Sequence, residues 1–258
     1  YSKKQIINFC YKTIEKNQDV MKSNDEDRLM IDVSRGILDI YKGVKNLHSG
    51  PNLIIADFPL RWTVQSMGML FDQGINAVIT PQRAIPSEYM DPKIKNRSRL
   101  FYLNANIEAS QLKGKNNWPI LLGSNGYITE GTGDNFFIVK DGNVLTPHGK
   151  DILRGISRDY VLNDLCDQLK IKSYEKNIEP YDVYTADEAF MTGTPFCMLP
   201  VTSFNDLKIG NGKRGKVFNK LLEVWSDNVS IDIEKQIKNW NKTTKKNKPK
   251  VSPYGFKR

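Results

Sequence analysis

The chain has 258 residues, of which 39% are hydrophobic and 26% are charged, and its formal net charge is +9. This length and composition predict a folded protein with a substantial core and exclude collagen-like, disordered and disulfide-scaffold classes. No apolar run approaches the ~18 residues that a membrane-spanning helix requires, so the sequence excludes a transmembrane helix.

The positive charge is concentrated at the carboxyl end. After Glu234 the chain has nine basic residues and no acidic residue, so residues 1–234 are formally balanced. The nine are Lys235, Lys238, Lys242, Lys245, Lys246, Lys248, Lys250, Lys257 and Arg258. A nucleic-acid-binding protein usually spreads basic residues over a folded face. We therefore expect residues 233–258 to form a solvated basic tail, and we do not expect nucleic acid as a partner.

The first residues and the cysteines bear on processing and compartment. The chain opens at Tyr1 rather than at a methionine, which predicts a fragment or a processed form. Its first stretch is amphipathic and has no cleavage site, so it is not a signal peptide. Cys10, Cys166 and Cys197 are odd in number and far apart, which favours a reducing cytoplasm.

Hydrophobic periodicity in the first 112 residues predicts two helices with three strands between them. The predicted helices are 4–17 and 98–112, and the predicted strands are 27–33, 52–57 and 75–80. The segment 81–92 contains three prolines and is predicted to be a loop or an interdomain linker.

Two β-hairpins are predicted next. Asn125-Gly126 lies between the short strands 120–122 and 127–129, and Asp141-Gly142 lies between FFIV at 136–139 and NVLTP at 143–147. Such dipeptides supply the positive φ angles that tight hairpin turns require.

The remaining elements alternate between helix and strand. Ser157 is predicted to be the N-cap of a helix whose apolar face carries Val161, Leu165 and Leu169. Residues 188–191 are predicted to be a strand that leads into a Thr192-Gly193-Thr194 loop, and 216–225 is the last clear helix. Mixed strands and helices with a mid-chain linker predict two α/β or α+β layers.

Several common catalytic motifs are missing. The sequence has no GxSxG, HExxH or Walker phosphate loop, and its only histidines, His48 and His148, lie in loop contexts and are expected at the surface. A histidine triad or a metal site is therefore not expected. Gly210, Gly212 and Gly215 form one GxGxxG, but no second strand follows the helix after it, so we interpret it as a loop that starts a helix.

Four segments carry a resemblance in series: 92–109, 126–147, 152–161 and 186–201. Together they resemble the class IV aminotransferases, which are pyridoxal-phosphate enzymes of fold type IV. The resemblance runs from about residue 28 to 230 and rests on the E-G-x-G-x-N, G-I-S-R and T-G-T-P elements. The family includes branched-chain and D-amino-acid aminotransferases and 4-amino-4-deoxychorismate lyase.

The resemblance implies an α+β (α/β) fold with two domains. The smaller N-terminal α/β domain is expected to be truncated, and the larger domain is expected to be a mixed, β-barrel-like structure. The implied ranges are 1–84 for the small domain, 85–94 for a linker, 95–232 for the cofactor-binding domain and 233–258 for the tail.

The resemblance places the cofactor-binding lysine at Lys95, fourteen residues before Ala109 of the IEA element. Composition does not select it, because the chain is lysine-rich and Lys93 lies two residues away. The neighbouring Arg97 and Arg99 are expected to lower its pKa, which favours the free amine that imine exchange and proton transfer need.

Glu130 matches the acid that faces the pyridinium nitrogen in this family. A carboxylate there keeps the ring cationic, so that the ring absorbs the electrons left when the α-proton is removed. The alternative is an ordinary surface glutamate at a strand end. Gly131 and Gly133 follow directly and suggest a crowded backbone, which favours the functional interpretation.

The phosphate is expected on the turn Gly155-Ile156-Ser157, because backbone N–H groups at a helix start bind anions. Thr194 matches a second phosphate contact, and Gly193 and Thr194 offer amides to the phosphate or the substrate carboxylate.

The resemblance implies further binding residues, at positions where the match to the family motifs is less specific. Arg99 and Tyr102 are expected to face the cofactor, although their register is open. Arg35, in VSRG, and Arg28 fall where some members bind the substrate carboxylate, and Pro195 is placed with them; either arginine is equally explained as a surface residue at a strand end.

The chain departs from the family at its beginning. Members begin with a G-x-F-E-x-x-R-like strand and an H-x-x-R-L helix whose arginine clamps the phosphate, and neither His48 nor His148 is followed by that pattern. We therefore expect the chain to start inside the small domain.

The resulting prediction is a pyridoxal-phosphate aminotransferase, cytoplasmic and homodimeric, that uses an amino acid (branched-chain or similar) and a 2-oxo acid through an imine on Lys95. A lyase acting on 4-amino-4-deoxychorismate is the alternative on the same fold. A non-catalytic homologue whose lysine tail binds acidic partners is a third hypothesis.

Overall fold

A computed structural model describes residues 1–45 and 50–243. The described residues form two compact units, which divide after Val64. The predicted boundary between domains was residue 84. The contacts instead divide the chain after Val64, because the strand from Ile75 to Arg83 pairs within the large sheet of the second unit.

The first unit is a helix packed on a two-stranded hairpin. Helix α1 (Lys3–Asn17) is capped by Ser2, whose hydroxyl accepts from the backbone of Gln5 while the Gln5 side chain accepts from the backbone of Ser2. Strands β1 (Asp27–Ser34) and β2 (Asn52–Pro59) pair antiparallel. The predicted helix and both predicted strands are confirmed. Short helical turns complete the unit at Gln18–Val20, Asp39–Tyr41 and α2 (Arg61–Val64).

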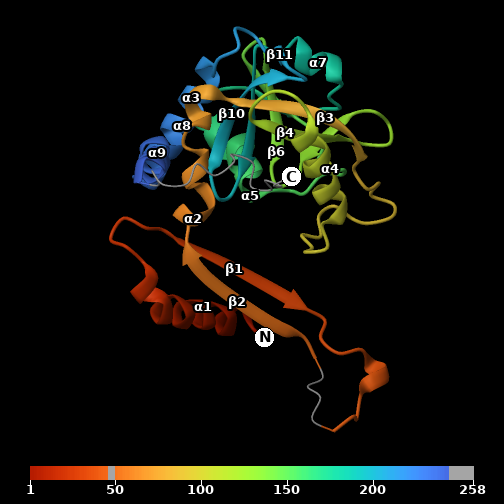
Figure 1. Ribbon diagram of the computed structural model, residues 1–258, viewed down its shortest axis with the longest axis vertical. Helices are drawn as coiled ribbons and strands as arrows, with labels where there is room; N and C mark the ends of the chain where they lie inside the picture. The colour runs from red at the N-terminus through yellow and green to blue at the C-terminus, as the bar shows by residue number, and fades with distance from the viewer. Residues whose placement is uncertain (46–49, 244–258) are drawn as a thin grey trace. The chain divides into compact units, whose positions relative to one another are not determined.

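The second unit is built on a nine-stranded sheet (Figure 1). Its strands are β3 (Ile75–Arg83), β4 (Asn117–Leu122), β5 (Ile128–Gly131), β6 (Asn135–Lys140), β7 (Asn143–Thr146), β8 (Ser173–Glu175), β9 (Glu188–Gly193), β10 (Cys197–Phe204) and β11 (Leu207–Lys208). The order β11-β10-β3-β4-β5-β6-β7-β8 is closed by β9, which pairs with both β10 and β6. The closure produces the barrel-like domain that the resemblance implied.

Helices surround this sheet (Figure 1). They are α3 (Leu70–Gln73), α4 (Leu100–Gln111), α5 (Ile156–Asp159), a π-helical stretch (Tyr160–Leu165), α6 (Cys166–Gln168), α7 (Pro180–Tyr184), α8 (Lys216–Val229) and α9 (Ile233–Thr243), with a short turn at Gln65–Met67. Helix α4 packs on β3 and β4, and α5 and α8 pack on β9. Stacked rings of Phe137 and Phe190, 4.8 Å apart, join β6 to β9 in the core.

Both predicted hairpins are confirmed, as β4–β5 and β6–β7. At the second turn Asp141 and Gly142 have φ angles of 50° and 73°, the left-handed pair that a type I′ turn needs. Strand β10 was not predicted, because its nearly continuous burial removes the alternation that marks a half-buried strand. No helix within residues 1–45 and 50–243 has both the length and the apolar content to cross a bilayer.

The predicted solvated tail, 233–258, is wrong in its first part, because residues up to Thr243 form α9. Ile233, Ile237 and Trp240 recur at helical spacing and are all buried. Residues 244–258 lie outside the described part. Helix α9 is also held by Lys238, whose Nζ lies 2.6 Å from the Asp72 carboxylate in α3.

Replacing Trp240 by alanine is expected to lower the free energy of unfolding by about 3–5 kcal/mol, because the 2%-exposed ring would leave a cavity under α9. Denaturant unfolding of this variant beside Lys242→Ala, a change at an exposed position of the same helix, measures the effect. Equal unfolding midpoints for the two variants would contradict the packing described for α9.

Candidate active site

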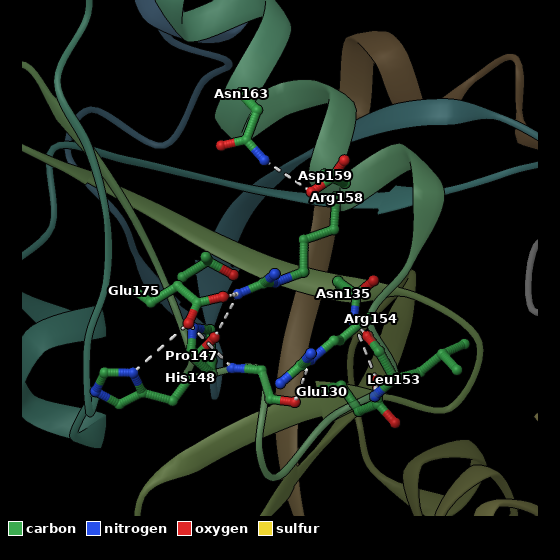
Figure 2. Close-up of polar contacts among 12 residues, drawn as sticks. Glu130, Asn135, Pro147, His148, Leu153, Arg154, Arg158, Asp159, Asn163 and Glu175 are labelled. Atoms are coloured by element: carbon green, nitrogen blue, oxygen red, sulfur yellow. Dashed lines mark hydrogen bonds and ion pairs between the residues drawn. The ribbon is translucent and has the colours of Figure 1, made fainter. Parts of the chain in front are cut away.

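Glu130 lies at the centre of the site on β5, and its carboxylate accepts three hydrogen bonds. Oε1 accepts from the Tyr102 hydroxyl at 2.5 Å, and Oε2 accepts from the Asn135 amide at 3.1 Å and from the Leu153 backbone N–H at 3.0 Å. Figure 2 shows Asn135 and Leu153 beside Glu130. The side chain is 6% exposed. Its position is therefore fixed from helix α4, from strand β6 and from the loop that contains Leu153.

Burial raises the pKa of Glu130 to about 7, against the opposing effects of the hydrogen bonds from Tyr102 and Leu153 and of the Arg99 and Lys95 charges. The pKa of Tyr102 is also raised, by burial and by the Glu130 charge, so Tyr102 stays a donor. A carboxylate in this environment gains more from a nearby cation than one in water would.

Lys95 and Glu130 line the same small pocket, whose volume is about 30 Å³. Arg99 and Tyr102 also line it, and Ile94 is among its apolar walls. Lys95 lies in the irregular segment that precedes α4, and it is exposed. The structure thus brings together the lysine and the acid that the sequence predicted, although they are 35 residues apart.

Arg99 and Tyr102 reach this pocket from the start of α4. Arg99 is the N-cap residue of that helix, and its guanidinium lies 4.7 Å from the centre of the Tyr102 ring. Residues three apart lie on the same side of a helix, which explains why both side chains turn to the pocket. Their predicted contact with a cofactor remains a prediction.

Asn135 is a site residue that sequence reasoning missed. Its amide donates to Glu130 and also to the Leu153 carbonyl at 2.9 Å. A Cβ at Gly155 would collide with its Oδ1, so the approach of Gly155 requires glycine. Asn135 is the last residue of the E-G-x-G-x-N element, and that membership was the available signal.

The Gly155-Ile156-Ser157 turn does start a helix, but Ser157 is not its N-cap. Gly155 holds that position with extended backbone, and Ser157 is the second helical residue, buried at 8% exposure. The first-turn N–H groups of a helix have no intrahelical acceptor. The predicted anion-binding role of this turn therefore moves to the N–H groups after Gly155, and it remains a prediction.

The T-G-T-P element is divided between strand and turn. Thr192 and Gly193 end β9, while Thr194 lies in the exposed turn that follows with Pro195. Thr192 is paired in register with Asn135, so their side chains share one face of the sheet. Its hydroxyl is buried without a hydrogen-bond partner among the described residues. Such an orphaned hydroxyl is available to a ligand, and Thr192 was not predicted.

Asp134 is a second carboxyl near Glu130, half-buried overall with its Oδ1 atom buried, and it too was missed. Within the described ranges its Oδ1 has no hydrogen-bond partner, and burial followed by the Glu130 charge raises its pKa to about 8. Two neighbouring carboxyls of this kind hold protons that they would lose in water.

Stability of the cofactor-free chain is expected to fall as the pH rises from about 5 to about 8. Between its ordinary pKa of 4.5 and about 7, Glu130 keeps a proton in the folded chain that the unfolded chain has lost, so raising the pH favours unfolding. Asp134 acts in the same direction from 3.8 to about 8. Melting temperatures across this range measure the slope. Asp134→Asn should flatten it, and an unchanged slope in that variant would contradict the assignment.

The other predicted residues lie elsewhere. Arg28 bonds the Thr63 hydroxyl and lies over Phe58, and Arg35 is exposed and paired with Asp39 at 3.5 Å. Both belong to the first unit, and their substrate role remains a prediction.

The GxGxxG is confirmed as a helix-starting loop, because Gly215 is the N-cap of α8 and that helix is followed by α9. The Glu188 carboxylate accepts from the N–H groups of Val217 and Phe218, both at 2.9 Å. His48 lies outside the described residues. Within the part of the chain that the structure describes, no three His, Cys, Asp or Glu residues gather as metal ligands would.

Comparisons with known proteins agree on one family. The sequence model of the family "Amino-transferase class IV" matches residues 2–204. The branched-chain-amino-acid aminotransferase of Pseudomonas aeruginosa is 38% identical over 134 residues, 52% of this chain and 43% of that protein. The one from Salmonella typhimurium is 34% identical over 176 residues, 67% of this chain and 55% of that protein. The chain thus spans about half the length of these relatives.

Solved structures agree on the fold. A branched-chain amino acid aminotransferase of Escherichia coli superposes with a TM-score of 0.73 at 28% identity, over 88% of this chain and 72% of that one. An enzyme of the same name from Thermobaculum terrenum, described as the PLP-form (holo-form), gives a TM-score of 0.67 at 22% identity, over 84% and 67% of the two chains.

Proposed function

We propose, since the chain belongs to the class IV aminotransferase family, that it carries the reactive centre of a pyridoxal-phosphate-dependent aminotransferase. The observation that carries the proposal is the shared pocket of Lys95 and Glu130, in which an amine and a rigidly held carboxylate lie together. A pyridoxal enzyme needs a lysine for the cofactor's aldehyde and an acid for its ring nitrogen.

The residues present fit such a cofactor at three points. Glu130 offers a buried carboxylate whose pKa is raised, so a cationic ring nitrogen would be a strongly favourable partner. The helix start after Gly155 offers backbone N–H groups to a phosphate. The orphaned Thr192 hydroxyl, on the same sheet face as Asn135, offers a further donor.

When bound, pyridoxal phosphate supplies a conjugated ring that accepts the electron pair left by loss of the substrate's α-proton. Lys95 is the group proposed to take that proton and return it. Its side chain is exposed and lines the pocket, and the charges of Arg99 and Lys95 lie close enough to lower the pKa of Glu130. Tyr102, Asn135 and the Leu153 N–H hold the carboxylate in one orientation while the proton moves.

The proposed substrates are a branched-chain or similar amino acid and a 2-oxo acid, on the strength of the relatives' names. A homodimer and a cytoplasmic location complete the proposal, and the family resemblance and the three free cysteines support them.

A direct test soaks the purified chain with pyridoxal phosphate and records its absorption spectrum, followed by assays with leucine and 2-oxoglutarate. We expect a visible band from bound cofactor and formation of glutamate. A parallel assay with 4-amino-4-deoxychorismate tests the lyase alternative, which release of 4-aminobenzoate without transamination would favour. Absence of any bound cofactor would overturn the proposal.

A further inference from the structure

The buried guanidinium of Arg158 is not among the groups that line the pocket of Lys95 and Glu130. Its side chain is 4% exposed, and Nη2 donates to the Pro147 carbonyl at 2.9 Å and to Glu175 Oε1 at 2.5 Å. Pro147 directly follows β7, and Glu175 is the last residue of β8 (Figure 2). One side chain at the start of α5 therefore ties the ends of two strands to that helix.

We call the contacts of Arg158 with Glu175 and the Pro147 carbonyl the tether. The other carboxylate oxygen of Glu175 makes further contacts. Oε2 accepts from the Gly149 backbone N–H at 3.4 Å, and His148 Nδ1 lies 3.8 Å away. Burial alone would raise the pKa of Glu175, but the hydrogen bond and the charge of Arg158 hold that pKa below its ordinary value. The carboxylate is thus ionised at neutral pH and pairs with a buried cation.

The segment 147–155 runs from this tether to the candidate site. Its far part supplies the Leu153 N–H to Glu130 and the Leu153 carbonyl to Asn135, and it ends at Gly155, the N-cap of α5. The structure describes every residue of this segment and places no helix or strand in it. The buried Ile152 side chain anchors its middle, and polar contacts hold its two ends. Arg158 and Glu175 hold the near end, and Asn135 and Glu130 hold the far end.

We infer that Arg158 and Glu175 are positioning residues, whose ion pair holds segment 147–155 so that the Leu153 N–H meets Glu130 and the helix start faces the site. The identification of this site as a cofactor site rests on the proposed function. The position of the Leu153 N–H is independent of that function, because its hydrogen bond to Glu130 is present in the chain alone.

The test compares Arg158→Lys and Glu175→Gln with Arg214→Lys, which makes the same substitution in another 2.5 Å ion pair, with Glu234. Hydrogen exchange at the Leu153 amide of the cofactor-free protein is the first readout, with the core amide of Ile138 as internal reference. In the two tether variants only, we expect the Leu153 amide to exchange about tenfold faster. Such an increase is expected when the charge-assisted hydrogen bond between Arg158 and Glu175 is weakened. Glu175→Gln decides alone if Arg158→Lys does not fold, since the Glu175 side chain is half-exposed.

The second readout is the dissociation constant of pyridoxal phosphate, which we expect to rise about tenfold in the same variants. Unchanged exchange at Leu153 would overturn the inference, and so would a rise at Leu153 that only matches the rise at Ile138. If wild-type protein binds no pyridoxal phosphate, the proposed function fails, while the exchange experiment still decides the tether.

Discussion

Replacing Lys95 by alanine is expected to abolish covalent attachment of pyridoxal phosphate and to lower transamination by about 10⁴-fold, near the upper end of what a positioned acid–base group contributes. The side chain combines two tasks, because the same amine would bind the aldehyde and move the α-proton. Borohydride reduction followed by peptide mass spectrometry should find the cofactor on Lys95 in wild type and no labelled peptide in the variant.

Lys93 provides a matched control for this experiment. It has the same side chain two residues away, and its Nζ lies 2.7 Å from the Asp91 carboxylate. It is not among the residues that line the pocket with Glu130. Lys93→Ala should keep the visible band and most of the activity. A labelled peptide carrying cofactor on Lys93 would contradict the assignment of the reactive amine to Lys95.

The site was predictable from sequence where its residues lie in short motifs. Glu130 stands beside glycines in a family element, and the Asp141-Gly142 turn joins the two strands of the β6–β7 hairpin. Helix α9 could also have been predicted, because Ile233, Ile237 and Trp240 have helical spacing. The lysines between these residues favoured the prediction of a solvated tail instead. Amphipathic spacing decided the structure there, and net charge did not.

Other parts of the site depend on contacts that no local pattern contains. The Leu153 group that meets Glu130 is a backbone N–H, which every residue except proline carries. Thr192 lies opposite Asn135 only because β6 and β9, which are far apart along the chain, pair in one register. A shift of that register by one residue would turn Thr192 to the other face, so the pairing had to be seen.

Glu130→Gln is expected to lower transamination by about 10²- to 10³-fold, the size of losing one preorganised electrostatic group. Glutamine has nearly the same shape, but it removes the negative charge that would hold a proton on the cofactor ring. Glu130→Asp should keep part of the activity, because it retains the charge and shortens the reach. Steady-state rates at about pH 8, above the raised pKa of Glu130, measure both, with the exposed Glu223→Gln on α8 as the control.

Glu130→Gln should also raise the melting temperature of the cofactor-free chain at about pH 8. Burial raises the pKa of Glu130 to about 7, so above that pH the folded chain holds an ionised carboxylate that is unfavourable in its buried position. A neutral amide removes that penalty, although it replaces one acceptor with a donor next to the Tyr102 hydroxyl or the Leu153 N–H. If Glu130 had a purely structural role, replacing it would lower the melting temperature of the chain. Loss of activity together with a gain in stability would therefore show that Glu130 is kept for its charge toward a ligand, and a fall in both would contradict that role.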